Sequence, residues 1–367
     1  MQGQAPRPIN LLITADYELF LGRNFFGHDE VLFGPAEQLM ARCEGLGVGV
    51  TFFADVCSVW AHRRFGLSDY ADQFETQMQE AVKRGHDVQL HLHPHWLNST
   101  WCEDRWQVAT DRMYLAEFGF SSDEEAAPAI IKRGVDYLHD LLRPETPEYR
   151  CAAFRAAGLA LQPDERKLIA ALLKLGIKID SSIAKELVLD LDTIAIDYRR
   201  MPGAANWYLA PDCGIAQDAG AGLLEIPIAT FKCGLLSRLG FLSRRLRSVR
   251  MRRGAGISRS SEQTRWSNLS TMLRYNLRYL YGNPLFSLSC DTKGHNLDML
   301  LNGFGKYLRQ HSDSSPIYVA MINHPKLMFD AQFDMLESFV SAARSRYGDA
   351  LDFVTTTDVI RQIDGEN

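Results

Sequence analysis

The fold is decided by the segment from Val48 to His91, which begins Val48-Gly-Val-Thr-Phe-Phe-Ala54 and ends His86-Asp-Val-Gln-Leu-His91. Both ends are short apolar runs, which are typical of buried strands. Between them, residues 69–84 place apolar side chains at helical spacing, and Gly85 ends that pattern. A strand, a helix and a second strand in this order predict parallel strands covered by helices.

The same alternation extends along the chain in both directions. Further strands are expected at residues 9–14, 150–155, 177–180, 223–228, 317–322 and 352–355, and further helices at 35–46, 123–142, 163–175 and 330–347. About seven strands separated by helices predict an α/β fold of the (β/α) barrel type, incomplete or distorted. Because no linker is visible, we expect one domain over residues 1–367, with an insertion at about 232–290.

The composition is that of a globular protein, with 46% hydrophobic and 23% charged residues among 367. No stretch approaches 18 uncharged apolar residues, which argues against a membrane-spanning segment. The seven cysteines form no C-x-x-C pair, which argues against a disulfide framework and a thiolate zinc site. With no secretion signal apparent at the start, we expect a cytoplasmic protein.

The charge is unevenly distributed, although the whole chain carries only −5. From Lys232 to Arg278 there are twelve basic residues and one acidic residue, so a uniformly basic nucleic-acid binder is not expected. Within this insertion, residues 234–253 mix arginines and apolar side chains at helical spacing. The apolar members are Leu235, Leu236, Leu239, Phe241, Leu242 and Leu246. Two interpretations stay open: a solvated basic helix, or peripheral contact of residues 234–265 with an anionic membrane or a lipid-linked glycan.

Polar residues recur where predicted strands end. They are Asp16 and Glu18 after the first strand, His91, His93 and His95 after the third, and Arg155, Asp180 and His324 after later strands. In parallel α/β folds the loops at the carboxyl ends of strands converge over one mouth, and chemistry occurs there. The repeated placement therefore predicts a single site.

The densest group is the histidine cluster that follows the third strand. If the chain turns helically at Pro94, His91 and His95 share a face, whereas an extended chain places His91, His93 and His95 together. Two imidazoles and a carboxylate from the first strand would hold a divalent cation and leave positions open for water and substrate. The alternative is a polar edge stacked beside Trp96, which is the preferred interpretation for His93 alone.

Each remaining residue also has a structural interpretation. Asp16 and Glu18 could form a turn and helix-capping pair, or one could serve as a general base and the other as a metal ligand. Asp180 could cap the turn at Ser181. His324 could be a satisfied core histidine or a proton donor. Arg155 lies among small apolar residues, so we expect it to have a buried carboxylate partner.

This set of residues resembles the NodB-type polysaccharide deacetylases, carbohydrate esterase family 4, whose fold is a distorted (β/α)7 barrel. Thr14-Ala-Asp-Tyr-Glu18 resembles the D-x-D/E form of the first motif, and His91 with His95 matches the H-x-x-x-H motif. Arg155, the Asp180-Ser-Ser segment and His324 match three later motifs. The resemblance covers residues 9–230 and 316–363, and it is greatest for a WalW-like subgroup associated with lipopolysaccharide biosynthesis.

The resemblance implies that Asp16, Arg155, Asp180 and His324 are catalytic residues. Asp16 is then the general base, Arg155 holds it in place, and His324 protonates the leaving amine. The implied ligands of a divalent ion, Zn²⁺ by expectation, are Glu18, His91 and His95. The implied reaction removes an acetyl group from an N-acetylated sugar of a polysaccharide or lipopolysaccharide precursor, linked to a nucleotide or a lipid. No nucleic acid partner is expected.

The chain departs from the family pattern at Tyr17, which stands where a second aspartate is usual, and no segment clearly supplies the Asp-Trp motif. Three other functions remain as alternatives. Two histidines and a carboxylate also occur in non-haem iron oxygenases. An allantoinase-like cyclic amidase shares the barrel, and Tyr17 would suit a catalytically inactive glycan-binding relative.

Overall fold

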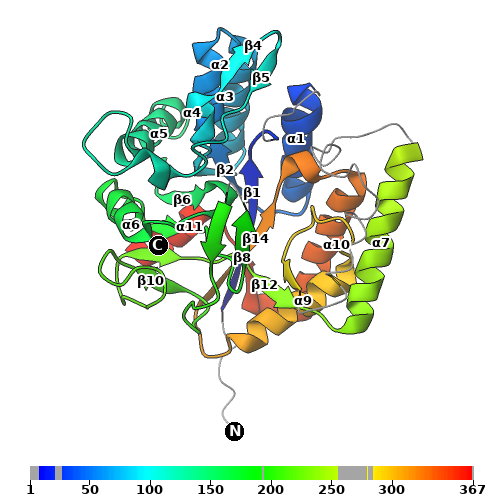
Figure 1. The fold of residues 1–367 in the computed structure, drawn as a ribbon. Coiled ribbons are helices and arrows are strands. Elements are labelled where there is room, and N and C mark those ends of the chain that lie inside the picture. Colours follow the sequence, from blue (N-terminus) through cyan, green and yellow to red (C-terminus); the bar gives the residue numbers. More distant parts are fainter. Residues whose placement is uncertain (1–7, 21–26, 192–193, 255–278, 280–283, 366–367) are drawn as a thin grey trace.

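A curled sheet of mainly parallel strands forms the centre of the computed structural model (Figure 1), which describes residues 8–20, 27–191, 194–254, 279 and 284–365. Nine strands of the described chain make this sheet, in the order β10-β11-β7-β6-β3-β2-β1-β14, with β15 also paired to β1. Their bounds are β1 Ile9–Tyr17, β2 Val50–Asp55, β3 Asp87–Leu92, β6 Ala153–Ala156, β7 Ile179–Asp180, β10 Trp207–Leu209, β11 Leu223–Glu225, β14 Ile317–Asn323 and β15 Leu351–Phe353. All pairs are parallel except β10 with β11.

The two ends of the parallel sheet approach each other just beyond β11. Ile228 forms one parallel bridge to Ala320 of β14 and another to Ala184, and the Ala229 amide donates to the Ala320 carbonyl at 3.0 Å. The sheet is thus curled, and its strand ends converge. The predicted α/β class with parallel strands is confirmed, while the count of seven barrel strands stays a prediction.

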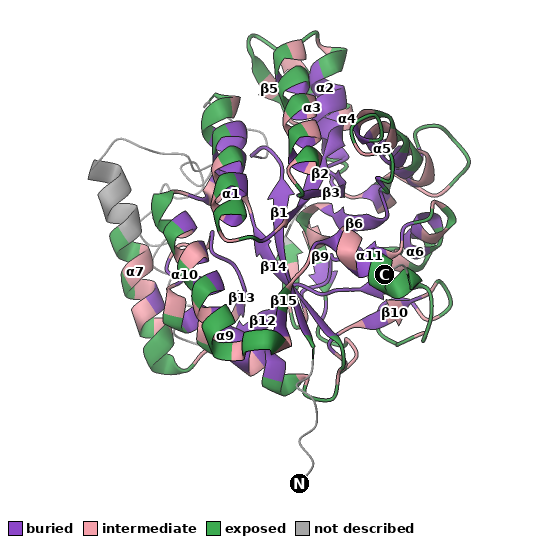
Figure 2. Ribbon diagram, turned by 180° about the vertical axis from the view of Figure 1, so that it is seen from behind, coloured by how far each residue is buried: buried purple, intermediate pink, exposed green. Residues whose placement is uncertain are grey.

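Helices cover the sheet and bury its strands. They are α1 Gly34–Gly45, α2 Val56–Arg64, α3 Ser68–Lys83, α5 Ala127–Leu142, α6 Glu165–Lys174, α9 Leu297–Gln310, α10 Asp330–Tyr347 and α11 Thr356–Asp364. Figure 2 shows buried strands at the centre and helices with exposed outer faces. Every residue of β1, β2, β3 and β14 is buried, and β1, β2 and β14 are accordingly mainly apolar. Strand β3 also buries Asp87, Gln89 and His91.

The predicted helices agree with α1, α3, α5, α6 and α10 to within a few residues. The sequence analysis missed α2, α9 and α11, together with two hairpins, β4 Thr100–Cys102 with β5 Arg105–Gln107 and β8 Val188–Leu191 with β9 Ile194–Asp197. Helix α2 follows β2 without a loop, because Asp55 ends the strand and its side chain accepts the Cys57 amide at 3.2 Å as an N-cap. No turn signal separates the two elements.

The structure describes both ends of the predicted basic insertion. Strand β12, Thr230–Lys232, pairs antiparallel with β13, Leu285–Ser287, and the basic helix α7, Leu235–Gly254, follows β12. Residues 255–278 and 280–283 lie outside the described residues, so part of the proposed lipid contact at 234–265 does too. The single-domain organisation stays a prediction. Within the described chain, no helix is both long and apolar enough to cross a membrane.

Candidate active site and metal centre

Strand β1 delivers two carboxylates to the interior of the curled sheet. Successive side chains of a strand point to opposite faces, so Asp16 and Glu18 share one face and Tyr17 takes the other. Tyr17 is fully buried, packs edge-on against Phe74 and Phe52, and donates its hydroxyl to Gln77 at 2.6 Å. Tyr17 therefore belongs to the core between β1 and the helices, and its presence leaves the Asp16 and Glu18 positions intact.

Strand β3 delivers the histidines by the same alternation. The chain stays extended through His93, whose amide donates to Asp55 Oδ1 at 3.0 Å, and it turns only at Pro94 to enter α4, His95–Asn98. His91 and His93 consequently lie on the same face, whereas His95 begins the next helix. The extended conformation, one of the two expected after the third strand, is thus found as far as His93. The turn at Pro94 then redirects the chain.

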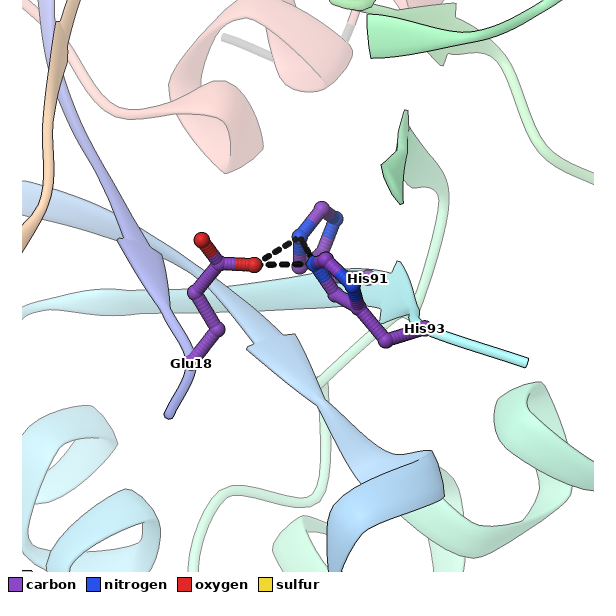
Figure 3. A group of neighbouring side chains, drawn as sticks. All are labelled: Glu18, His91 and His93. Atoms are coloured by element: carbon purple, nitrogen blue, oxygen red, sulfur yellow. Dashed lines mark hydrogen bonds and ion pairs between the residues drawn. The ribbon is translucent and has the colours of Figure 1, made fainter. Parts of the chain in front are cut away.

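Glu18, His91 and His93 form a group whose donor atoms all lie within 4.8 Å of one another (Figure 3). His91 Nε2 lies 3.2 Å from Glu18 Oε2 and 3.0 Å from His93 Nε2, and His93 Nε2 also contacts that oxygen. The Nδ1 of His91 lies 2.7 Å from the Arg155 carbonyl, so it carries the proton and leaves Nε2 free to coordinate. Three buried donors aimed at one point fit a divalent cation.

His95 lies beside this group but is not part of it. Its ring centroid is 5.4 Å from that of His93, and it is fully buried, with no hydrogen-bond partner for either nitrogen among the described residues. Burial and the nearby charge of His93 lower the pKa of His95 to about 3. A neutral, unpaired imidazole is a chemically suitable further ligand, so His95 stays a predicted ligand and His93 joins the candidates.

Glu18 divides its two oxygens between different partners. Oε2 faces the histidines, and Oε1 accepts from Lys326 Nζ at 2.7 Å. Burial raises the pKa of the Glu18 carboxyl, but the charges of His93 and Lys326 and the histidine hydrogen bonds outweigh it. These interactions hold the pKa well below its usual range. The carboxylate is therefore ionised and ready to bind a cation.

Arg155 has the buried carboxylate partner that its apolar surroundings led us to expect. Its guanidinium is fully buried and pairs with Asp16 Oδ1 at 2.5 Å. It also donates to Thr14 Oγ1 at 3.0 Å, to the Ser181 carbonyl at 2.8 Å and to Ser181 Oγ at 2.9 Å. It stacks over Phe53, with 4.1 Å between Cζ and the ring centroid. With Oδ1 held in this way, Asp16 turns Oδ2 toward His324.

His324 faces both carboxylates of β1. Its Nε2 lies 3.6 Å from Asp16 Oδ2 and 3.8 Å from Glu18 Oε1, while Nδ1 is 2.6 Å from Asp291 Oδ2. Burial lowers the pKa of His324, but the hydrogen bond and charge of Asp291 and the charges of Asp16 and Glu18 raise it above its ordinary value. His324 is thus suited to holding a proton that it can donate.

Asp180 is buried near Arg155 and is bonded to Ser182. It accepts from the Ser182 amide at 3.0 Å and from Ser182 Oγ at 2.8 Å, and it neighbours the buried Glu225, whose pKa burial and the charge of Asp180 raise well above its usual range. The next residue, Ser181, accepts two hydrogen bonds from Arg155, whereas Asp180 itself is bonded to Ser182. The catalytic role expected of Asp180 stays a prediction.

The sequence analysis missed four residues that contribute to the site. His93 was set aside as a polar edge, and Asp55, Asp291 and Lys326 were not considered. Asp55 ends β2, so the rule that located Asp16 and His91 applies to it as well. Lys326 follows His324 by two residues, but no sequence signal connects Asp291 with His324, because their contact spans 33 residues.

Comparison with known proteins identifies the fold. No protein-family model and no curated protein matches the chain. Among solved structures, it is similar to an inferred polysaccharide deacetylase from Mycobacterium smegmatis, with a TM-score of 0.50 and 12% identity over 100% of this chain and 93% of that one. An inferred polysaccharide deacetylase from Pseudomonas aeruginosa PAO1 gives a TM-score of 0.46, with 13% identity over 99% and 93%. The allantoinase Puue gives 0.48, with 12% over 100% and 92%. The likeness to the Mycobacterium structure shows that the two chains share a fold.

Proposed function

We propose that the protein is a metal-dependent deacetylase of the NodB type, which removes an acetyl group from an N-acetylated sugar. The observation that carries this proposal is one constellation at the strand ends. Asp16, whose carboxylate is held by a buried arginine, faces His324, whose ring is held by a buried aspartate. Both lie beside the Glu18–His91–His93 group. Metal-assisted hydrolysis of an amide uses a general base, a general acid and a cation-binding group in one site.

The proposed ligands are Glu18 and His91 with His93, His95 or both, and Zn²⁺ is the proposed ion. A divalent cation held there supplies Lewis-acid polarisation of the acetyl carbonyl and lowers the pKa of a bound water. The chain's own contribution to this site is to bury the four side chains and to fix their orientation. All four side chains are buried, and the Arg155 carbonyl fixes the His91 ring through Nδ1.

The remaining chemistry belongs to Asp16 and His324. Asp16 Oδ2 takes the proton from the attacking water, while Arg155 on Oδ1 keeps the carboxylate oriented. His324 Nε2 then gives its proton to the departing sugar amine, and Asp291 compensates the positive charge that His324 carries before this step. The amide and water become acetate and the free amine, so atoms balance without a further reactant.

The proposed substrate is an acetylated sugar of a polysaccharide or lipopolysaccharide precursor, carried by a nucleotide or a lipid, as in the WalW-like subgroup. The proposed setting is the cytoplasm, and the proposed fold is a distorted (β/α)7 barrel over residues 1–367 with one insertion. The shared fold with the Mycobacterium structure supports the proposed fold.

The test of turnover is acetate release from N-acetylated nucleotide sugars and lipid-linked glycans, with and without added Zn²⁺. Asp16→Asn should keep the metal but lose turnover by about 10²- to 10⁴-fold, because an amide cannot accept the water's proton. Allantoin serves as the alternative substrate. Hydrolysis of allantoin in place of the acetylated sugars, or an Asp16→Asn protein that turns over normally, would refute the proposal.

The ligand set has its own test, which is the metal content of purified variants. We expect about one ion per chain, and alanine at Glu18 or His91 should remove it, since loss of a ligand lowers affinity strongly. His93→Ala and His95→Ala form a matched pair that differs only in which neighbouring imidazole is removed. Retention of the metal in one of them assigns that histidine a structural role, and retention in all four variants contradicts the site.

A further inference from the structure

Helix α7 is attached to the molecule by one face. Phe241 is fully buried and packs against Phe286 at 5.0 Å and His295 at 5.6 Å between ring centroids. Arg244 Nε donates to the Gly294 carbonyl at 2.9 Å. Phe241, which the sequence analysis grouped with the leucines as a lipid-contacting residue, is therefore an anchor to the protein. Its position fixes which side of the helix faces outward.

The outward side carries a row of leucines. The exposed fractions are 54% for Leu235, 84% for Leu236, 46% for Leu239 and 42% for Leu246. At about 100° per residue, these positions fall within an arc of about 100° on the side opposite Phe241. We call these four residues the leucine stripe. A helix normally turns its apolar side toward the core, so an apolar stripe on the outer side marks an interaction surface.

Positive charge flanks the leucine stripe. Helix α7 contains seven arginines and no acidic residue. By helical geometry, Arg247 falls directly beside the stripe, and Arg238 and Arg245 fall between its other edge and Phe241. Arg244 lies on the attached side, where it binds Gly294. Long arginine side chains beside an apolar row match a surface whose interior is hydrocarbon and whose outer layer is anionic. Nucleic acid would account for the arginines but leave the exposed leucines unexplained.

We propose that α7 docks the protein on an anionic lipid surface, with the leucine stripe inserted and the arginines at the headgroups. Figure 1 shows α7 at the outer edge of the molecule. A second copy of the chain is a less suitable occupant, since a stable dimer buries roughly 800 Å² on each partner. The proposal does not depend on the proposed chemistry, although docking would also bring the loop that carries Asp291 toward the membrane, because α7 contacts the neighbouring Gly294.

The test is flotation of the full chain with vesicles of phosphatidylglycerol and phosphatidylcholine, compared with phosphatidylcholine alone, at low salt. We expect flotation with the anionic vesicles only, decreasing as salt screens the arginines. Replacing the leucines in Leu235→Ser/Leu236→Ser/Leu239→Ser should reduce binding by about tenfold or more. Val188→Ser, at another exposed apolar residue, is the matched control and should leave binding unchanged.

A further double variant separates the effect of charge from that of apolar contact. Arg245→Gln/Arg247→Gln should weaken binding at low salt and flatten its salt dependence, while acetate release from a soluble substrate stays unchanged. Failure of the parent chain to float, equal flotation with neutral vesicles, or undiminished flotation of the leucine variant would each overturn the docking proposal. The flotation readouts do not require catalysis, so the docking and the chemistry can fail separately.

Discussion

At the scale of single residues, Lys326 is the least expected member of the site. It is 8% exposed, and its ammonium group lies 2.7 Å from Glu18 Oε1 and 3.0 Å from the Leu19 carbonyl. Glu18 is a proposed metal ligand, and the buried ammonium of Lys326 already neutralises part of its negative charge. Lys326 therefore stabilises the site without metal and repels a divalent ion that enters it.

Lys326→Met should strengthen metal binding by the metal-free protein several-fold, because it removes a positive charge while keeping an unbranched side chain in place. Titration calorimetry with Zn²⁺ measures this directly. Lys185→Met is the matched control, since Lys185 is also largely enclosed but binds the Pro202 carbonyl, away from Glu18. Unchanged or weaker metal binding in Lys326→Met would mean that the lysine mainly orients Glu18.

What the sequence could predict of the site follows from strand alternation. Asp16 and Glu18 are two apart on one strand, so a single period-2 rule places both in the interior. The choice between His93 and His95 depends on where the strand stops, and this is decided by the turn at Pro94 and the bond from the His93 amide to Asp55. Asp291 has no local pattern at all, because only the folded chain brings it to His324.

At the scale of elements, the long periodic helices and the apolar strands were predictable because each carries its own pattern. Helix α2 was missed because it continues directly from β2, and its side chains are buried from Val56 to His62. A helix buried on nearly all sides has no polar face, so its sequence loses the alternation on which the prediction depends. Packing with α3 and the sheet, rather than local preference, makes it a helix.

The contact between α9 and β12 gives a prediction at this scale. A Cβ on Gly303 of α9 would lie 2.6–2.7 Å from three ring atoms of Phe231, which is 3% exposed and stacks on Phe286 of β13. Gly303→Ala should therefore destabilise the fold by about 1–3 kcal/mol, as overpacking against a buried ring does. Urea unfolding measures the change.

Gly45→Ala is the matched control for this glycine. Gly45 ends α1, and a Cβ there meets nothing within 4 Å. Alanine loses less conformational freedom on folding, so this substitution should be neutral or stabilising by about 0.4–1 kcal/mol. An equal loss of stability in both variants would show that the close approach of α9 to Phe231 is not the cause.

At the scale of the whole molecule, buried histidines connect stability to pH. His62 and His295 lie far apart in the chain, and each is at most 7% exposed. Each has Nδ1 hydrogen-bonded to a carbonyl, Ser58 for His62 and Ser289 for His295, and an Nε2 with no partner among the described residues. Burial lowers the pKa of both to about 4. Each is therefore neutral in the folded protein over most of the acidic range.

The unfolded chain behaves differently, since a free histidine has a pKa of about 6.5. Between pH 6.5 and 4 the unfolded state binds a proton at each position and the folded state does not. Stability is thus fully present above pH 6.5 and is lost as the pH falls toward 4. At about 1.4 kcal/mol per pH unit, each histidine should cost on the order of 2 kcal/mol by pH 5.

We expect the free energy of unfolding in urea to fall between pH 7.5 and 5, and the double variant His62→Asn/His295→Asn to lose about 4 kcal/mol less over that range. Asparagine suits the comparison because its amide can still donate to the Ser58 and Ser289 carbonyls but does not titrate. His91 and His324, whose pKa values are raised by neighbouring carboxylates against the opposing effect of burial, contribute stability that is lost as pH rises. They are present in both proteins, so the difference between parent and variant isolates the two buried histidines. Equal slopes in the two proteins would show that His62 and His295 accept protons in the folded state, which would require water to reach their unpaired Nε2 atoms.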